Sequence, residues 1–535
     1  MLEHTNQFTK SARAELPMTP AVVPDVIDWE RLERFLVLGT EGGTYYVGER
    51  ELALEAAAAV ARCLAADGIR TINRIVVSIE TGRAPKNDPA IFSLAMAAKL
   101  GDQATRRHAY AMLPKVCRIG TELMHFAEYA QAFGGWGRGM RKAVGSWFNA
   151  RPATELAHQL ATYQTREGWS NRDLLRLAHP RAASPSHDRL YAWAVKGTLP
   201  EDATADPALG PVVALERLRA TDDIAFAAQI IRDHAVPREC VPTHLLHSPQ
   251  VWDALLEAMP LAAVLRELPA MTRVGLLAMG SAAANEVVWR LRDRTQLEAA
   301  RIHPFGFLAA LVTYRSGRGA RGQGTWLPVA SIVDALDAAF YTSFSTVEPA
   351  GKRMLLALDV SGSMGCGAVA GVPGLSPRIA SAAMALVTGA TEREQTLVAF
   401  TAAAGGYGGK WGGGDSGITA VSISSRKRLD DVVDELGALP MGGTDCALPM
   451  IWAHKHRIDV DAFVVYTDNE TWAGDVHPAE ALRAYRDARG ISAKLVVVGM
   501  TSTEFSIADS NDAGMLDVVG FDTSTPPVIA DFARA

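Results

Sequence analysis

The sequence contains no run of 18 or more consecutive apolar residues, so no membrane-spanning helix is expected. Its first residues, MLEHTNQFTKSARAEL, lack an apolar core segment, and no secretory signal is expected there. Only five cysteines occur among the 535 residues, and none forms a CxxC pair. This scarcity predicts a cytoplasmic location and argues against a structural zinc site.

Neither sign of charge dominates the chain, whose formal net charge is −6. Residues 351–535 carry a net charge of −7 and residues 1–350 carry +1. The first part is therefore not basic as a whole, and any binding of nucleic acid there requires local basic patches. The apolar content of 48% is typical of a globular protein, and the length predicts two or more domains.

From about residue 350 onward, short β-rich runs alternate with helical stretches. The runs are RMLLALDV, QTLVAF, DAFVVYTD and AKLVVVGM, and the helical stretches are SPRIASAAMALVTGA, LDDVVDELGAL and AEALRAYRDARG. This alternation predicts a parallel sheet covered by helices, joined by right-handed crossovers. In such sheets ligands bind beyond the carboxyl ends of the strands.

From about 30 to 345 the pattern is helical, with no convincing series of strands. In HPFGFLAALVTYRSG, Pro304 suits a first helical turn and Gly317 suits a helix end. Similar segments recur, punctuated by proline or glycine, although no strict repeat motif is present. Paired helices over such a length predict an α-solenoid, in which each pair buries its apolar face on the next.

Oxygen-bearing side chains occur where two predicted strands end and in one glycine-flanked loop. They stand in the motifs DVSGS, GGTD and YTD: Asp359, Ser361, Ser363, Thr444 and Asp468. Oxygen ligands without histidine or cysteine favour Mg²⁺ or another hard divalent cation over zinc or copper. The set resembles the metal-ion-dependent adhesion site of von Willebrand factor A domains. The alternative is a serine-rich turn with an unrelated YTDNE loop.

Basic residues gather in three stretches beside glycine and aromatic residues. The stretches are TGRAPKNDP, GGWGRGMRKAVGSWF and TYRSGRGARGQGTW, with the cations Arg83, Lys86, Arg138, Arg141, Lys142, Arg315, Arg318 and Arg321. Trp136, Trp147 and Phe148 lie near the second group in sequence. Such patches suit phosphate contacts and base stacking in RNA, while the alternative is a solvated charged face or cations at helix ends. Histidines such as His125 and His303 are more often packed or capping residues than ligands.

The glycine-rich stretch AAAGGYGGKWGGGDSG, at 402–417, predicts a solvated surface loop. It contains no GxxxxGK[ST] motif, so a phosphate-cradling loop is the less favoured interpretation.

Several longer motifs together resemble one family, the Ro ribonucleoprotein autoantigen and its bacterial Ro-related members. They are EGGTYYVG, GGWGRGMRKAV, RDLLRLAHP, RIHPFGFLAALVTY, GGTDCALPMIWA and YTDNETWAG. The resemblance implies an all-α, HEAT-like TROVE ring over residues 1–350, followed by an α/β von Willebrand factor A domain over 351–535. It also implies a monomeric ring.

The resemblance further implies the partners. Members of the family bind small noncoding Y RNAs on the ring surface and admit single-stranded 3′ ends of misfolded RNAs to its hole. Bacterial members can tether the exoribonuclease polynucleotide phosphorylase through a Y RNA. In GWSNRDLL, Asn171 stands where animal members carry a histidine implicated in Y RNA contact. We therefore add Asn171 and His125 to the RNA-binding candidates.

Three functions compete at this stage. The favoured one is a non-catalytic RNA-binding scaffold acting in RNA quality control. The second is a protein-adhesion module whose A domain grips an acidic partner. The third, a metal-dependent phosphohydrolase, is weak because the motifs place neither a second metal cluster nor a catalytic base.

Overall fold

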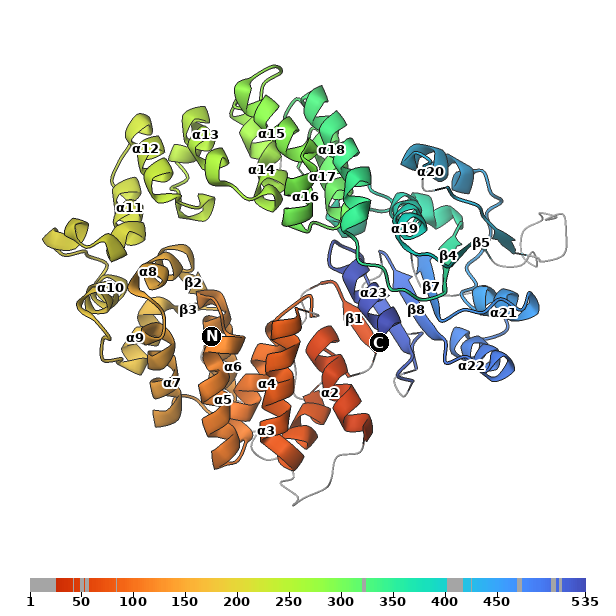
Figure 1. Cartoon of the computed structure of the whole chain (residues 1–535), viewed down its shortest axis with the longest axis horizontal. Helices are drawn as coiled ribbons and strands as arrows, with labels where there is room; N and C mark the ends of the chain where they lie inside the picture. Colours follow the sequence, from red (N-terminus) through yellow and green to blue (C-terminus); the bar gives the residue numbers. More distant parts are fainter. Residues whose placement is uncertain are drawn as a thin grey trace. The chain divides into compact units, whose positions relative to one another are not determined.

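The computed structural model describes residues 26–41, 43–48, 52, 57–82, 84–319, 324–401, 417–424, 426–468, 474–501, 507–509 and 512–535 (Figure 1). The chain forms two compact units. One comprises residues 1–41 and 51–259, and the other comprises residues 42–50 and 260–535. The predicted helical first part and the α/β last part are both confirmed. The domain limits at residues 350 and 351 stay a prediction.

Among its described residues, the first unit consists of helices and one short hairpin. They are α2 (Val26–Leu38), α3 (Ala58–Thr81), α4 (Asp88–Leu100), α5 (Gln103–Val116), α6 (Gly120–Ala132), α7 (Arg138–Asn149), α8 (Ala153–Thr162), β2 (Thr165–Arg166), β3 (Trp169–Ser170), α9 (Asn171–Ala178), α10 (Pro185–Lys196), α11 (Gly210–Arg219), α12 (Ile224–His234) and α13 (Pro249–Ala258). Helices pack mainly on others close in the chain, as α4 packs on α3, α5 and α6. This pattern of local packing is typical of helical repeats.

The second unit contains the strand β1 (Thr44–Tyr46) from residues 42–50, then a group of helices, and then the strands and helices of the α/β part. The helices before the sheet are α14 (Leu261–Arg273), α15 (Ala282–Arg292), α16 (Arg294–Ala300), α17 (Pro304–Ser316) and α18 (Ala330–Thr342). The later elements are β4 (Met354–Asp359), α19 (Pro377–Thr391), β5 (Gln395–Phe400), β6 (Ile418–Ala420), α20 (Leu429–Gly437), α21 (Leu448–Lys455), β7 (Ala462–Thr467), α22 (Pro478–Arg489), β8 (Lys494–Gly499), β9 (Met515–Val519) and α23 (Thr525–Arg534).

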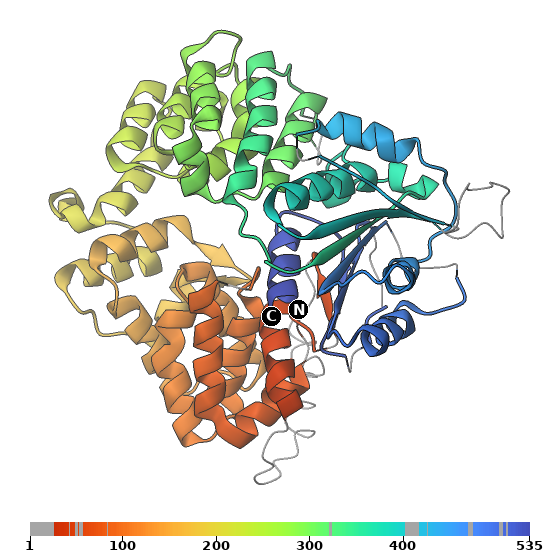
Figure 2. The ribbon, with the colours of Figure 1, turned by 45° about the vertical axis from the view of Figure 1, so that its right-hand side comes forward.

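The sheet has seven strands in the order β1-β9-β8-β7-β4-β5-β6. All neighbours are parallel except β6, which runs antiparallel to β5. The four predicted strands are confirmed as β4, β5, β7 and β8. Helix α19 covers one face and helices α21 and α22 cover the other (Figure 2). The strands are buried on both faces, which explains their unbroken apolar runs.

The edge strand β1 (Thr44–Tyr46) was not expected, because the sequence between 30 and 345 showed no convincing strand. It pairs in parallel with β9, with Tyr46 opposite Val519. The Tyr45 ring is 1% exposed, and its hydroxyl lies 2.8 Å from Ser524 Oγ. A three-residue strand carries too little alternation to be recognised, and its partner lies at the far end of the chain.

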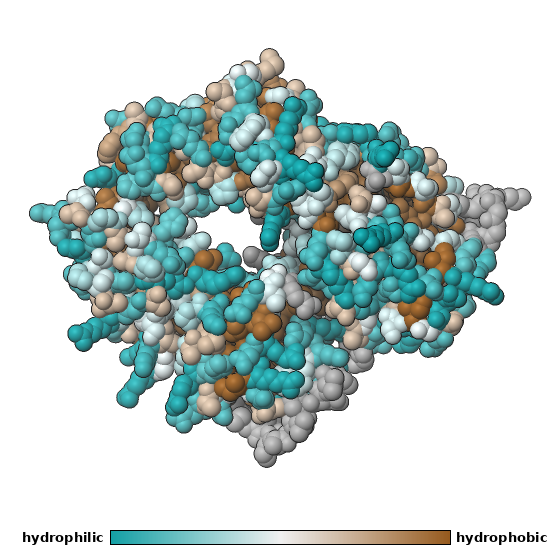
Figure 3. All heavy atoms as spheres, viewed as in Figure 1, coloured by the Kyte–Doolittle hydropathy of each residue, from teal (hydrophilic) through white to brown (hydrophobic). Residues whose placement is uncertain are grey.

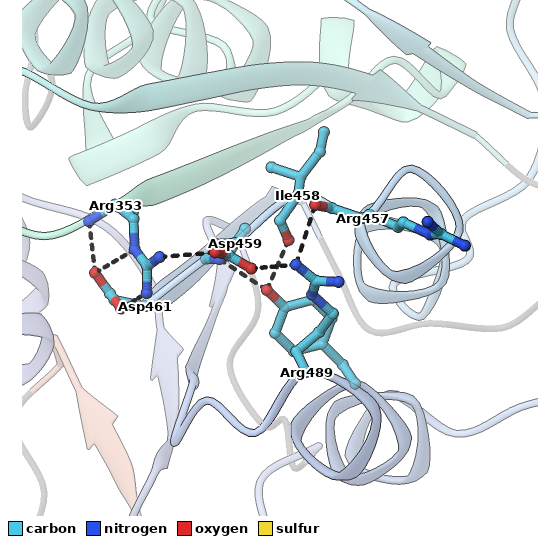
Figure 4. Close-up of polar contacts among 8 residues, drawn as sticks. Arg353, Arg457, Ile458, Asp459, Asp461 and Arg489 are labelled. Carbon is cyan, nitrogen blue, oxygen red and sulfur yellow. Dashed lines mark hydrogen bonds and ion pairs between the residues drawn. The ribbon is translucent and has the colours of Figure 1, made fainter.

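Ion pairs join the amino ends of the two central strands β4 and β7 (Figure 4). Arg353 binds the Asp461 carboxylate through Nε and Nη2, at 3.1 and 2.6 Å, and its backbone N–H donates to the same carboxylate. Asp459 accepts from Arg353 and from Arg489 of α22. This network joins two adjacent strands to a helix, so it holds the register of β4 against β7.

Helix α17 begins with a half-buried histidine cap, which confirms the capping interpretation of His303. Nδ1 of His303 accepts a hydrogen bond from the Phe305 backbone N–H at 3.2 Å. Pro304 follows at the first helical position, and Gly317 ends the helix with φ 68°, as the sequence predicts. Burial lowers the pKa of His303 to about 4 from 6.5. The cap therefore requires the neutral imidazole.

His303→Asn is expected to make the stability of the protein fall less as the pH is lowered. Because folded His303 resists protonation, acidification from about pH 6.5 to about pH 4 favours the unfolded chain, by about 3 kcal/mol in total. Asparagine also caps helices well but does not titrate. Thermal unfolding of both proteins from pH 7 to pH 4 should show the wild type losing stability relative to the variant. Parallel curves would contradict this account of the cap.

Hydrophilic side chains cover most of the face drawn in Figure 3. No helix in the described part of the chain is both long enough and apolar enough to cross a membrane.

Candidate functional site

The central strand β4 ends at Asp359, between the carboxyl ends of β5 and β7. The two following motif residues, Ser361 and Ser363, lie in the turn beyond it. Thr444 lies in the loop before α21, and Asp468 directly follows β7. The topology therefore brings all three motifs to one edge of the sheet.

Asp359 is the centre of a hydrogen-bonded cluster at this edge. Its carboxylate accepts from the Ser361 backbone N–H at 2.7 Å and from the hydroxyls of Thr444 and Thr467 at 3.2 and 2.8 Å. Ser361 Oγ lies 3.1 Å from Ser363 Oγ. Four of the five predicted side chains are thus linked to one another through hydrogen bonds.

The cluster runs from the interior to the surface. Asp359, Ser361 and Thr444 are 2%, 4% and 3% exposed, whereas Ser363 is exposed and Asp468 is half-buried. Burial raises the pKa of Asp359, and the negative charge of Asp468 raises it further. A cation among these oxygens would offset both effects, so the donor set fits a hard divalent ion.

Further side chains support the cluster but were missed in the sequence. Thr467 reads there as an ordinary strand residue, although it is the last residue of the strand beside Asp359. Thr401 Oγ1 donates to the Gly443 carbonyl at 2.8 Å and holds the loop that carries Thr444. Arg378 Nη2 donates to the Ser361 carbonyl at 3.4 Å.

No group of three or more His, Cys, Asp or Glu residues suited to a metal occurs in the described ranges. The predicted set, with only two carboxylates, would not form such a group.

Helix α7 displays the second basic group. Arg138, Arg141 and Lys142 are all exposed, and none of them has an ion pair or side-chain hydrogen bond with another described residue. Gly137 caps the helix without a side-chain hydrogen bond, and the first turn contains no acidic residue. The amino end of α7 is therefore open to an anion.

The neighbouring helix α9 adds cations that sequence reasoning missed. It packs on α7, and its Arg172 and Arg176 are exposed and unpaired within the described structure. The motif RDLLRLAHP contains both residues, and their separation by four positions is the local signal that places them on one helix face. Five cations on two packed helices thus lack carboxylate partners within the part of the chain that the structure describes.

Two other candidates are held by internal hydrogen bonds. Asn171 is 6% exposed, and its amide donates to the Tyr163 carbonyl at 2.6 Å. His125 Nδ1 lies 2.6 Å from Asp88 Oδ1, and its Nε2 accepts from Arg166 Nε at 2.9 Å. As placed, both side chains are engaged within the first unit. Lys86 is half-buried beside this region.

The third basic group spans the end of helix α17, with Arg315 in its last turn and Arg318 just beyond it. Arg315 and Arg318 are exposed, and their side chains form no ion pair with the residues described. Arg83, Arg321 and residues 402–416 of the glycine-rich stretch lie outside the described residues.

The idea that Trp147 and Phe148 lie beside the α7 cations as stacking partners is wrong. They are 1% and 0% exposed, because they lie on the buried face of the helix. Trp147 Nε1 donates to the Cys117 carbonyl at 2.6 Å, and the Arg151 guanidinium lies 3.6 Å from the centre of its ring. Trp136 is the aromatic residue of this stretch that remains half-exposed.

Two family models match the chain, the TROVE domain over residues 20–201 and 233–313 and the Ro60 vWA domain over residues 353–533. The chain is 42% identical to the RNA-binding protein RO60 of Deinococcus radiodurans, covering 95% of this chain and 93% of that protein. It is 34% identical to the RNA-binding protein RO60 of Caenorhabditis elegans, covering 95% and 88%. The crystal structure of the Deinococcus radiodurans RO (RSR) protein matches with a TM-score of 0.87 over 95% of this chain and 99% of that one.

Proposed function

Because this chain belongs to the Ro60 family, we propose that it is a non-catalytic scaffold that binds RNA in the cytoplasm. The observation that carries the proposal is the set of exposed cations on α7 and α9 (Arg138, Arg141, Lys142, Arg172 and Arg176), which lack carboxylate partners among the described residues. Cations already paired with carboxylates gain little from a phosphate, whereas unpaired ones release counterions from RNA on binding. The RNA-binding relatives support the same function.

The finer proposal concerns which RNAs are bound. We propose a small noncoding Y RNA on the helical surface and the single-stranded 3′ ends of misfolded RNAs in the hole of a ring. Through the Y RNA, the protein would also present such substrates to polynucleotide phosphorylase. The support is the resemblance in the TROVE region, together with the unpaired cations of the first unit.

The threading proposal predicts that RNA binding depends on a free single strand. A structured RNA with a single-stranded 3′ tail should compete for Y-RNA-free protein better than the same RNA with a blunt end, because a duplex is too wide for a hole that a flexible strand can enter. Competition binding with the two RNAs measures the difference. Equal competition would leave binding on the outer surface as the remaining mode.

We also propose that Asp359, Ser361, Ser363, Thr444 and Asp468 hold Mg²⁺ or a similar hard cation. The support is the linked oxygen cluster around Asp359 and its fit to such an ion. When bound, the ion would supply a coordination position for an acidic group of a partner. The five side chains would hold the ion. Thr467 would fix the Asp359 carboxylate, and Thr401 would fix the loop that carries Thr444.

A further inference from the structure

Two tryptophans of the first unit, one from the loop before α7 and one from the hairpin β2–β3, lie against each other. The ring centres of Trp136 and Trp169 are 5.8 Å apart, with 36° between the ring planes. Both side chains are half-buried, unlike the core residues Trp147 and Phe148, which are almost fully buried. The Nε1 atom of Trp136 is buried and has no hydrogen-bond acceptor in the described structure. Part of the surface of each tryptophan nevertheless remains open to solvent, because both residues are only half-buried.

The pair stands beside the amino ends of both cationic helices. Trp136 lies two residues before Arg138, the first residue of α7, and Trp169 lies three residues before Arg172 in the first turn of α9. The amino end of α7 has no side-chain cap and no acidic residue in its first turn. The two tryptophan rings are thus next in sequence to cations that have no partner among the described residues and to the uncapped backbone N–H groups of α7. Proteins that bind single-stranded nucleic acid use this combination.

Both rings are held in place by their surroundings. Gly134 and Gly135, with φ 137° and 71°, turn the chain after α6, and Lys99 binds the Gly135 carbonyl. Trp169 Nε1 donates to Glu128 Oε2 at 2.6 Å. The rings come from a short loop and a hairpin anchored on the same helix, α6. A fixed platform loses little conformational entropy when a ligand stacks on it.

We propose that Trp136 and Trp169 form a stacking site for one unpaired base of a bound RNA. The phosphates flanking that base lie on the amino end of α7 and on Arg138 and Arg172. This inference rests on the proposed RNA-binding function and assigns it a base-binding subsite. Stacking is indifferent to base identity, since every base presents a π-face, so the site recognises an unpaired nucleotide rather than a sequence.

The test uses a hairpin RNA with a single-stranded tail and a series in which one tail nucleotide at a time is abasic. An abasic nucleotide keeps the phosphate and removes only the base. For the wild type, one position in the series should lower affinity roughly tenfold. Trp136→Leu should lose a similar factor with the intact RNA and become insensitive to the abasic position, while Trp136→Phe recovers most of the affinity. The salt dependence of all these proteins should be the same, because stacking releases no counterions.

Trp169→Phe provides a second variant, which keeps an aromatic ring but loses the hydrogen bond to Glu128 that holds the ring, and it should bind more weakly than the wild type but better than Trp136→Leu. A flat abasic series, or Trp136→Leu binding like the wild type, overturns the stacking site while leaving RNA binding intact. If the wild type binds no RNA even at low salt, the proposed function itself fails. Thermal unfolding curves of each variant show whether weaker RNA binding comes from loss of the stacking site or from loss of the folded structure.

Discussion

Asp468→Ala is expected to weaken Mg²⁺ binding by at least about 10²-fold and to leave RNA affinity within about twofold. The predicted ligand set contains only two carboxylates, so the variant removes half of its formal negative charge. At an effective dielectric constant of 20, one such charge at 4 Å contributes about 4 kcal/mol, and metal–oxygen distances are shorter still. The cations proposed to bind RNA lie on α7 and α9, away from these loops in the sequence, so the affinity for RNA should not depend on whether the metal is bound.

Calorimetric titration with Mg²⁺ gives the affinity directly, and the rise of the unfolding temperature with Mg²⁺ gives an independent reading. Asp359→Asn is a second variant, which keeps the shape of the side chain and should lose the metal as well. Asp487→Ala removes an exposed carboxylate of α22 and serves as the matched control. If Asp468→Ala binds Mg²⁺ like the control, the five residues do not form a common metal site.

Replacing Arg138, Arg141 and Lys142 together with glutamine is expected to lower RNA affinity by about 10²- to 10³-fold near physiological salt. Each lost phosphate contact should also reduce the magnitude of the slope of log affinity against log salt concentration by about 0.7 to 0.9. For the triple variant, the total reduction in slope is about 2 to 3. The reason is that these exposed cations have no carboxylate partner among the described residues. Their positive charge is available to RNA.

The matched control is the triple variant of Arg219, Arg232 and Arg294 to glutamine. Each of these exposed arginines forms ion pairs, with Glu216, with Asp253 and Glu257, and with Glu298. It removes the same total charge from cations that are already engaged. Filter binding of one structured RNA at four or more salt concentrations compares the two triples. Equal slopes for both would assign the α7 cations to an ordinary solvated surface.

The strongly periodic parts of the fold could be predicted from the sequence. Strands β4, β5, β7 and β8 were recognised because a buried parallel strand requires an unbroken apolar run, and α17 because proline and glycine mark its ends. The placement of Asp359 and Asp468 at the same edge followed from the rule that parallel strands end at one edge, whereas the hydrogen bond from Thr444 to Asp359 depends on the loop before α21. Strand β1 could not be found, since its three residues acquire their role only from β9.

The side of a helix on which an aromatic residue falls was harder to predict. Trp147 and Phe148 stand near Arg141 in the sequence, yet the helix turns them into the core. Trp169 was overlooked because it approaches Trp136 only after the hairpin β2–β3 has formed. Asn171 illustrates the same limit, because its bond to Tyr163 depends on how α8 leads into the hairpin. Such contacts are set by tertiary structure and leave no local pattern.

The pairing of β1 with β9 also constrains the order of events during synthesis. Tyr45 and its hydrogen-bond partner Ser524 are 479 positions apart in the chain. At about 5 to 20 residues per second, β1 leaves the ribosome roughly half a minute to a minute and a half before its partner is made. The nascent protein must therefore carry an unpaired strand, with its hydrogen-bonding groups exposed, until translation is nearly complete. During that interval β1 is a natural target for a chaperone or for mispairing between neighbouring chains on a polysome.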